Sequence, residues 1–143
     1  MISVEIFRAW LEHRLTDETH LLRKRILVAS DDRGCGRSVE LAMRAMGHTV
    51  LLLNDLYSYD DVLLAAKAYG PDLVISYGSL NDVPSIGRLK DLDAPLIVIT
   101  GFAEPYRHAA AMRPFYLIDS PWLPDKLMAT VERALAESHR HQD

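Results

Sequence analysis

At 143 residues the chain is long enough to form one domain with a sizeable hydrophobic core, without a disulfide or a metal to hold it together. The composition, 49% hydrophobic and 25% charged, is that of a soluble globular protein, and a net charge of -4 gives no electrostatic reason to expect nucleic-acid binding. A single cysteine, Cys35, favours a reducing compartment. Charges near the N-terminus argue against a signal peptide, and no apolar run is long enough to span a bilayer, so we expect a cytoplasmic protein without a membrane partner.

Residues 1–22 are predicted to form an N-terminal helical extension, because apolar residues recur there mostly at three- and four-residue spacing. Two interpretations of this helix stay open. It packs on its own domain, or it presents Phe7, Trp10 and Leu11 to a second copy or another partner, since aromatic anchors carry much of the energy of interfaces. The second interpretation predicts a homodimer.

Apolar runs alternate with helix-patterned segments from residue 23 to residue 137, and residues 138–143 are expected to be a disordered tail. The run at 73–75 lies between a Pro-Asp start and a polar turn, which is typical of a central strand buried on both faces. In chain order, the predicted elements are strand 26–29, helix 37–46, strand 49–53, a helix capped by Asp60 and Asp61, strand 73–75, helix 85–92, strand 96–100, a short segment at 105–112, strand 115–118 and a helix from 124.

This alternation predicts an α/β fold, namely a flavodoxin-like doubly wound five-stranded parallel sheet of order 2-1-3-4-5 with an extra N-terminal helix. Ligands of open α/β sheets bind at the carboxyl ends of the strands. We therefore expect any site to lie in the loops Ser30–Gly36 and Tyr77–Asn81, which follow the first and third strands.

Several stretches carry a family resemblance: RILVASDD at 25–32, PDLVIS at 71–76, APLIVITG at 94–101 and SPWLPDKLMATVERAL at 120–135. From Lys24 to Glu137 the chain resembles the receiver domain of bacterial response regulators, the signalling module of two-component systems. The resemblance implies phosphoryl transfer to an aspartate at the end of the third strand, with Mg²⁺ held by acidic residues after the first strand. A Thr or Ser after the fourth strand and a Lys after the fifth complete that site.

The sequence departs from the family pattern at the residues that do this chemistry. Tyr77 stands at the phospho-acceptor position, and its neutral phenol is a poor Mg²⁺ ligand that cannot replace a carboxylate that binds metal and attacks phosphorus. Ser120 stands at the Lys position, so the cation that pairs with the acyl phosphate is missing. We therefore predict a pseudo-receiver with no catalytic residue, no metal and no cofactor. Matched motif by motif, the vestigial phospho-site consists of Ser30 and Asp31 at the acidic pair, Asp32 one place beyond, Tyr77 at the phospho-acceptor, Thr100 at the Thr and Ser120 at the Lys.

Tyr77 is expected to fill the emptied acidic pocket, with its ring over Ser30 and its hydroxyl bonded to Asp31 or Thr100. Such a contact would hold one conformation permanently. The predicted function is that of a stand-alone signalling domain that acts by binding a protein partner. Besides the N-terminal aromatic residues, Tyr116 and Trp122 are candidates for the contact surface.

The alternative is a small-ligand-binding α/β domain. Gly34, Cys35 and Gly36 resemble part of a dinucleotide-binding loop, although Val39 stands where the third glycine belongs. The same loop is similar to that of a cobalamin-binding domain, whose signature would fall on Asp31, Arg33 and Gly36, with Arg33 at the position of the cobalt-ligating His. A protonated arginine has no lone pair for a metal. Cys35 itself is interpreted as a small, half-buried residue.

Overall fold

The computed structural model describes residues 3–6, 23–54 and 58–142. Of the predicted N-terminal helix, residues 4–6 are helical, whereas Phe7, Trp10 and Leu11 lie outside the described residues. In chain order the elements are β1 (Arg25–Ala29), α2 (Arg33–Ala45), β2 (Thr49–Leu53), α3 (Tyr59–Tyr69), β3 (Leu73–Tyr77), the 3₁₀ helix η2 (Leu80–Asp91), β4 (Leu96–Thr100), α4 (Ala103–Ala109), β5 (Tyr116–Asp119) and α5 (Pro124–Gln142).

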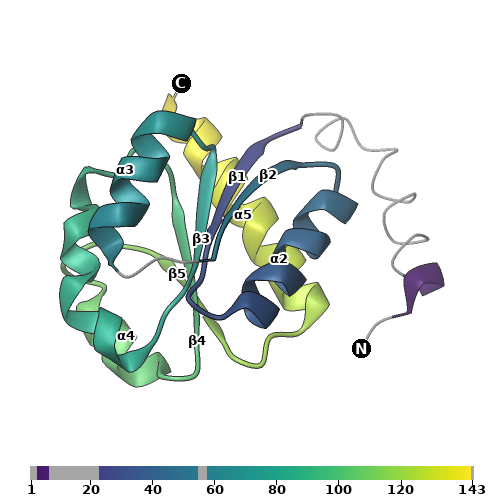
Figure 1. The fold of residues 1–143 in the computed structure, drawn as a ribbon. Helices are drawn as coiled ribbons and strands as arrows, with labels where there is room; N and C mark the ends of the chain where they lie inside the picture. Colours follow the sequence, from purple (N-terminus) through teal and green to yellow (C-terminus); the bar gives the residue numbers. More distant parts are fainter. Residues whose placement is uncertain (1–2, 7–22, 55–57, 143) are drawn as a thin grey trace.

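The strands form one five-stranded parallel sheet in the order β2-β1-β3-β4-β5, so the predicted fold class is confirmed (Figure 1). β3 is the central strand of the sheet, and its Ile75 lies beside Val28 of β1 and Ile97 of β4. Parallel pairing places the carboxyl ends of all five strands at the same edge, which positions the candidate site.

Alternate residues of the buried strands pack against helices on opposite faces of the sheet. α2 and α5 cover one face, where Val39 and Val131 pack on β1, β3 and β4. α3, η2 and α4 cover the other face, where Val62, Ile86 and Tyr106 pack on the same strands. The sheet is therefore covered on both sides, as its near-continuous apolar runs require. Within the described part of the chain, no helix is long and apolar enough to cross a membrane.

Several predicted boundaries were wrong, and local capping explains two of them. α2 begins at Arg33, four residues earlier than predicted, because the side chain of Asp32 accepts a hydrogen bond from the Cys35 amide at 3.0 Å. α3 is capped by Ser58, whose hydroxyl accepts from the Asp61 amide at 3.3 Å. The predicted caps of α3, residues 60 and 61, lie instead in its first turn.

Two further segments differ from their predictions. The helix predicted at 85–92 is the second half of η2, a long 3₁₀ helix whose start is fixed by the Ser79 amide donating to the Asp82 carboxylate at 3.1 Å. α5 continues to Gln142, so the prediction of a disordered tail from residue 138 was wrong. No glycine or proline follows Pro124 in the sequence, and nothing there ends the helix.

Candidate functional site

The carboxyl edge of the sheet brings together residues that lie far apart in the sequence. Ser30 follows β1, Tyr77 ends β3, Thr100 ends β4 and Ser120 follows β5. Ser30 and Thr100 are buried, whereas Tyr77 and Ser120 are half-buried. The predicted site residues therefore share one edge, and their hydrogen bonds decide what they can do.

Tyr77 and Ser120 are joined by a hydrogen bond, with 2.5 Å between the Tyr77 hydroxyl and Ser120 Oγ. The prediction that Tyr77 would bond to Asp31 or Thr100 was therefore wrong. Thr100 is occupied within its own loop, because its hydroxyl oxygen accepts from the Phe102 amide at 3.0 Å. The Ser120 amide donates to the Thr100 carbonyl at 2.8 Å, which holds Ser120 where the Tyr77 hydroxyl reaches it.

The pKa of Tyr77 is raised above its ordinary value. The bond to Ser120 has the largest single effect and lowers the pKa, but burial and the electrostatic influence of Cys35 and Asp32 together outweigh it. Tyr77 is therefore a neutral phenol at physiological pH. It is neither an anionic metal ligand nor a nucleophile for phosphorus.

The loop after β1 uses its polar groups internally. Ser30 Oγ accepts from the Asp32 amide at 3.0 Å and donates to the Asp32 carbonyl at 2.8 Å, while Asp32 caps α2. Asp31 is exposed. A serine hydroxyl, a neutral phenol and a carboxylate that caps α2 are a poor donor set for Mg²⁺, which prefers carboxylate oxygens. Among the described residues, no three His, Cys, Asp or Glu side chains form a group that could hold a metal ion.

Gly36 has a packing role that replaces the dinucleotide interpretation. A β-carbon at Gly36 would lie 3.0 Å from Cβ of Ser30 and 3.1 Å from Cδ1 of Leu52, so the glycine lets α2 approach β1 and β2 closely. Both Gly34 and Gly36 lie inside α2 rather than in a loop before it. Gly36 therefore supports close packing of α2 on the sheet.

Sequence analysis missed two tyrosines at this edge. Tyr59 of α3 and Tyr106 of α4 are buried with 3.4 Å between their hydroxyl oxygens, and the Tyr106 hydroxyl donates to the Ser79 carbonyl at 2.8 Å. Burial is the main cause that raises the pKa of both phenols, so both are neutral. The pattern of apolar residues had placed Tyr59 and Tyr106 in or beside helices. It carried no signal that their two hydroxyls would lie in contact with each other next to the Ser79 carbonyl.

The space between the loops after β1 and β3 is small. Ser30, Asp31, Ser76, Tyr77 and Asp82 are among the residues that line a cavity of about 30 Å³. That volume is about the share of one water molecule in the liquid. Among the described residues, the cavity is therefore much smaller than a typical small-molecule site of roughly 300 to 1,000 Å³.

The two predicted surface aromatics are only partly accessible. Tyr116 and Trp122 are half-buried, and the Arg133 guanidinium lies 5.2 Å from the Tyr116 ring centroid. Two other apolar side chains are more exposed, Phe102 at 45% and Leu123 at 70%. Both follow strands that end at the carboxyl edge, and neither was among the predicted contact residues.

Several solved structures have a similar fold. The signal receiver domain of a modulated diguanylate cyclase from Desulfovibrio desulfuricans G20 matches with a TM-score of 0.68 at 22% identity, over 84% of this chain and 99% of that one. NtrX from Brucella abortus matches with a TM-score of 0.72 at 23% identity, over 85% of this chain but 28% of its own. PhyR from Bartonella quintana, an anti-anti-sigma factor, matches with a TM-score of 0.68 at 20% identity, over 99% of this chain and 59% of its own.

Neither a protein-family model nor a curated protein matches this sequence. The similarity to the solved structures lies below 25% identity and concerns the fold, whose strand order is the one described above. The chain therefore has the five-stranded fold of response-regulator receiver domains.

Proposed function

We propose that this chain is a pseudo-receiver: a signalling domain that is not phosphorylated on aspartate and acts by binding a protein partner. The observation that carries the proposal is the 2.5 Å hydrogen bond between Tyr77 and Ser120. These two residues stand where the receiver resemblance implies the phospho-acceptor and the Lys. Their hydroxyls bind each other, and neither supplies the charge that phosphoryl transfer on Mg²⁺ needs.

The same contacts support a single fixed conformation. Tyr77 links the end of β3 to the residue after β5, and the Ser120 amide links that residue to the end of β4. In receiver domains the Thr that corresponds to Thr100 responds to the phosphoryl group. In this chain the hydroxyl oxygen of Thr100 accepts a hydrogen bond from the Phe102 amide. A ligand shifts a conformational equilibrium only by its differential affinity for two states, so without phosphoryl transfer this source of switching is absent.

Three observations favour a protein partner over a small ligand at this edge. The cavity of about 30 Å³ beside Tyr77 is small for the nucleotide or cobalamin of the alternative interpretation. Phe102 and Leu123 expose apolar surface beside the Tyr77–Ser120 link. The similar PhyR structure is described as an anti-anti-sigma factor, a name that supports a protein partner in signalling.

Self-association through residues 1–22 remains a separate part of the proposal, since Phe7, Trp10 and Leu11 lie outside the described residues. Analytical ultracentrifugation at roughly tens of micromolar tests it, because a specific interface holds a dimer at that concentration. A monomer at that concentration would exclude this route. Deletion of residues 1–22 should convert a dimer into a folded monomer.

The main experiment is exposure of the purified protein to acetyl phosphate and Mg²⁺, followed by intact-mass measurement. We expect no stable gain of a phosphoryl group, while a conventional receiver domain treated in parallel gains one. A Mg²⁺-dependent phosphoryl group on Asp31 or Asp32 would contradict the proposal.

Partner binding has its own test. Once a partner is identified by capture from the native host, Leu123→Asp and Phe102→Asp should weaken its binding. Leu64→Asp is the matched control, because Leu64 is 67% exposed on α3, away from this surface. Equal binding by all three variants would place the contact elsewhere.

A further inference from the structure

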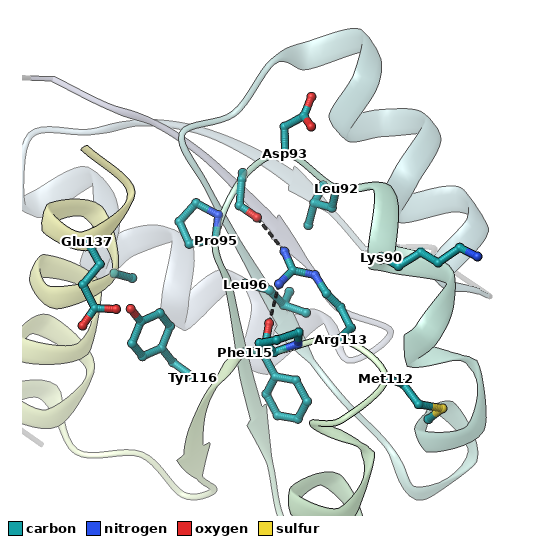
Figure 2. Close-up of a pocket in the computed structure, with 13 residues that line it drawn as sticks. Lys90, Leu92, Asp93, Pro95, Leu96, Met112, Arg113, Phe115, Tyr116 and Glu137 are labelled. Carbon is teal, nitrogen blue, oxygen red and sulfur yellow. Dashed lines mark hydrogen bonds between the residues drawn. The ribbon is translucent and has the colours of Figure 1, made fainter. Parts of the chain in front are cut away.

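A second cavity lies at the opposite, amino edge of the sheet. It has a volume of about 560 Å³ and is formed between the starts of β4 and β5, the end of η2, the loop before β5 and the C-terminal part of α5 (Figure 2). Small-molecule sites in proteins have volumes of roughly 300 to 1,000 Å³. The cavity is therefore large enough for a ligand, unlike the space beside Tyr77.

Arg113 stands in the middle of this cavity and is held in place by backbone carbonyls. Its Nε donates to the Leu89 carbonyl at 3.0 Å. One terminal nitrogen donates to the Ala94 carbonyl at 2.8 Å, and the other donates to the Pro114 carbonyl (Figure 2). A guanidinium carries five N–H groups. These contacts use three, which fixes the orientation of the side chain and leaves two N–H groups without a partner among the described residues.

Among the residues that the structure describes, the charge of Arg113 has no counter-ion. None of the ion pairs among the described residues involves Arg113, and its half-burial lowers its pKa without removing its charge. A cation withdrawn from water is costly unless it is paired. Carbonyl dipoles offset part of that cost, and an anion that binds in the cavity would offset more.

The other residues that line the cavity indicate what charge and what kind of body the anion has. Leu92, Pro95 and Met112 supply apolar side chains to the lining. Asp93 and Glu137 also line the cavity and outnumber its second cation, Lys90, so they would repel a highly charged ligand. A monoanion with an apolar body suits this lining better than a polyphosphate does. A carboxylate also matches the planar fork of a guanidinium.

We propose that the cavity around Arg113 binds a small organic monocarboxylate with a flat, apolar body. The carboxylate pairs with the two remaining N–H groups of Arg113, and the body lies against Leu92, Pro95 and Met112. The preorganised guanidinium makes this pairing possible at a low cost in side-chain entropy. The site is independent of the Tyr77 edge, so it holds or fails separately from the pseudo-receiver proposal.

The experiment is titration of the full chain with naphthalene-2-carboxylate, monitored by NMR of backbone amides and of the Arg113 Nε–H. Naphthalene-2-carboxamide, which is neutral and of the same shape, is the matched control ligand. We expect saturable shifts at Leu96, Phe115 and Arg113, and binding at least about tenfold weaker for the amide. Equal binding of the two ligands, or shifts located at the carboxyl edge, would overturn the proposal.

Two variants complete the test. Arg113→Gln should reduce the preference for the carboxylate to about twofold or less. Because this change also removes carbonyl contacts, Met112→Trp provides a second variant: Met112 lines the cavity and is 49% exposed, so a larger side chain there narrows the cavity while Arg113 stays. Leu64→Trp, on the exposed side of α3, is the control. Unchanged carboxylate binding by Met112→Trp would show that the ligand does not occupy this cavity.

Discussion

Gly78 lies directly against the hydroxyl of Tyr106: a β-carbon built on Gly78 would fall 2.3 Å from the Tyr106 oxygen and 2.7 Å from its Cζ. Tyr106 is fully buried, and its hydroxyl is held by the Ser79 carbonyl at 2.8 Å. The ring cannot move aside without losing that hydrogen bond. The glycine after β3 is thus required by packing, and it lets the backbone turn over the buried phenol.

This relationship predicts the effect of a single methyl group. Gly78→Ala should lower the free energy of unfolding by about 1 to 3 kcal/mol, because the added carbon overpacks a buried site. Urea denaturation measures the change. Gly101→Ala is the matched control, since a β-carbon there meets nothing within 4 Å, and it should leave the stability nearly unchanged. Equal effects of the two substitutions would contradict the packing argument.

The Tyr77–Ser120 hydrogen bond predicts coupling between two residues that are 43 positions apart. Tyr77→Phe and Ser120→Ala should each destabilise the fold by about 0.5 to 1.5 kcal/mol, the usual net contribution of a hydrogen bond. The double variant should cost less than the sum of the two single variants. Additive changes in a double-mutant cycle, measured by urea denaturation, would show that the two hydroxyls act independently.

Restoring an acidic residue at the end of β3 should not restore phosphorylation. Tyr77→Asp removes a half-buried ring and adds a negative charge near Asp32, so we expect a loss of about 1 to 3 kcal/mol in stability. With Ser120 in place of the Lys, acetyl phosphate should still leave the intact mass unchanged. An unchanged or higher melting temperature at neutral pH would show that Tyr77 contributes nothing to the packing of this edge.

Glu40 predicts an acid-dependent loss of stability. Burial raises the pKa of Glu40, but its hydrogen bonds to Arg37 at 2.5 Å and Arg44 at 3.2 Å and the charges of these two arginines outweigh burial. The pKa of Glu40 is therefore lowered from its ordinary value of 4.5. A lowered pKa in the folded state stabilises the fold fully above the unfolded-state pKa, and this contribution is lost as the pH falls through the folded-state pKa.

The measurement compares the native chain with Glu40→Gln by urea denaturation between pH 7 and pH 3. The native chain should be the more stable at pH 7, and the difference should shrink below about pH 4.5. Glu104→Gln is the control, because Glu104 pairs with Arg107 on the surface and should show little difference at any pH. A difference for Glu40→Gln that stays constant over this range would rule out the charged pairing.

The amino-acid sequence by itself determined the sheet. Apolar runs of about five residues that alternate with helix-patterned segments are typical of a parallel sheet with helices on both faces, and 2-1-3-4-5 is the usual order of a flavodoxin-like sheet with five strands. It also placed Ser30, Tyr77, Thr100 and Ser120 at one edge, because parallel strands share the direction in which they end.

Only the tertiary structure decided which of these groups bind one another. Tyr77 reaches Ser120 rather than Asp31 or Thr100 because backbone hydrogen bonds set the position of each loop, and those bonds join strands far apart in the sequence. The approach of Tyr106 to Gly78 likewise depends on how α4 packs on the sheet. Periodicity specifies which face of an element is buried, but the partner of each polar side chain depends on distances of a few tenths of an ångström, which arise only when all the elements pack together.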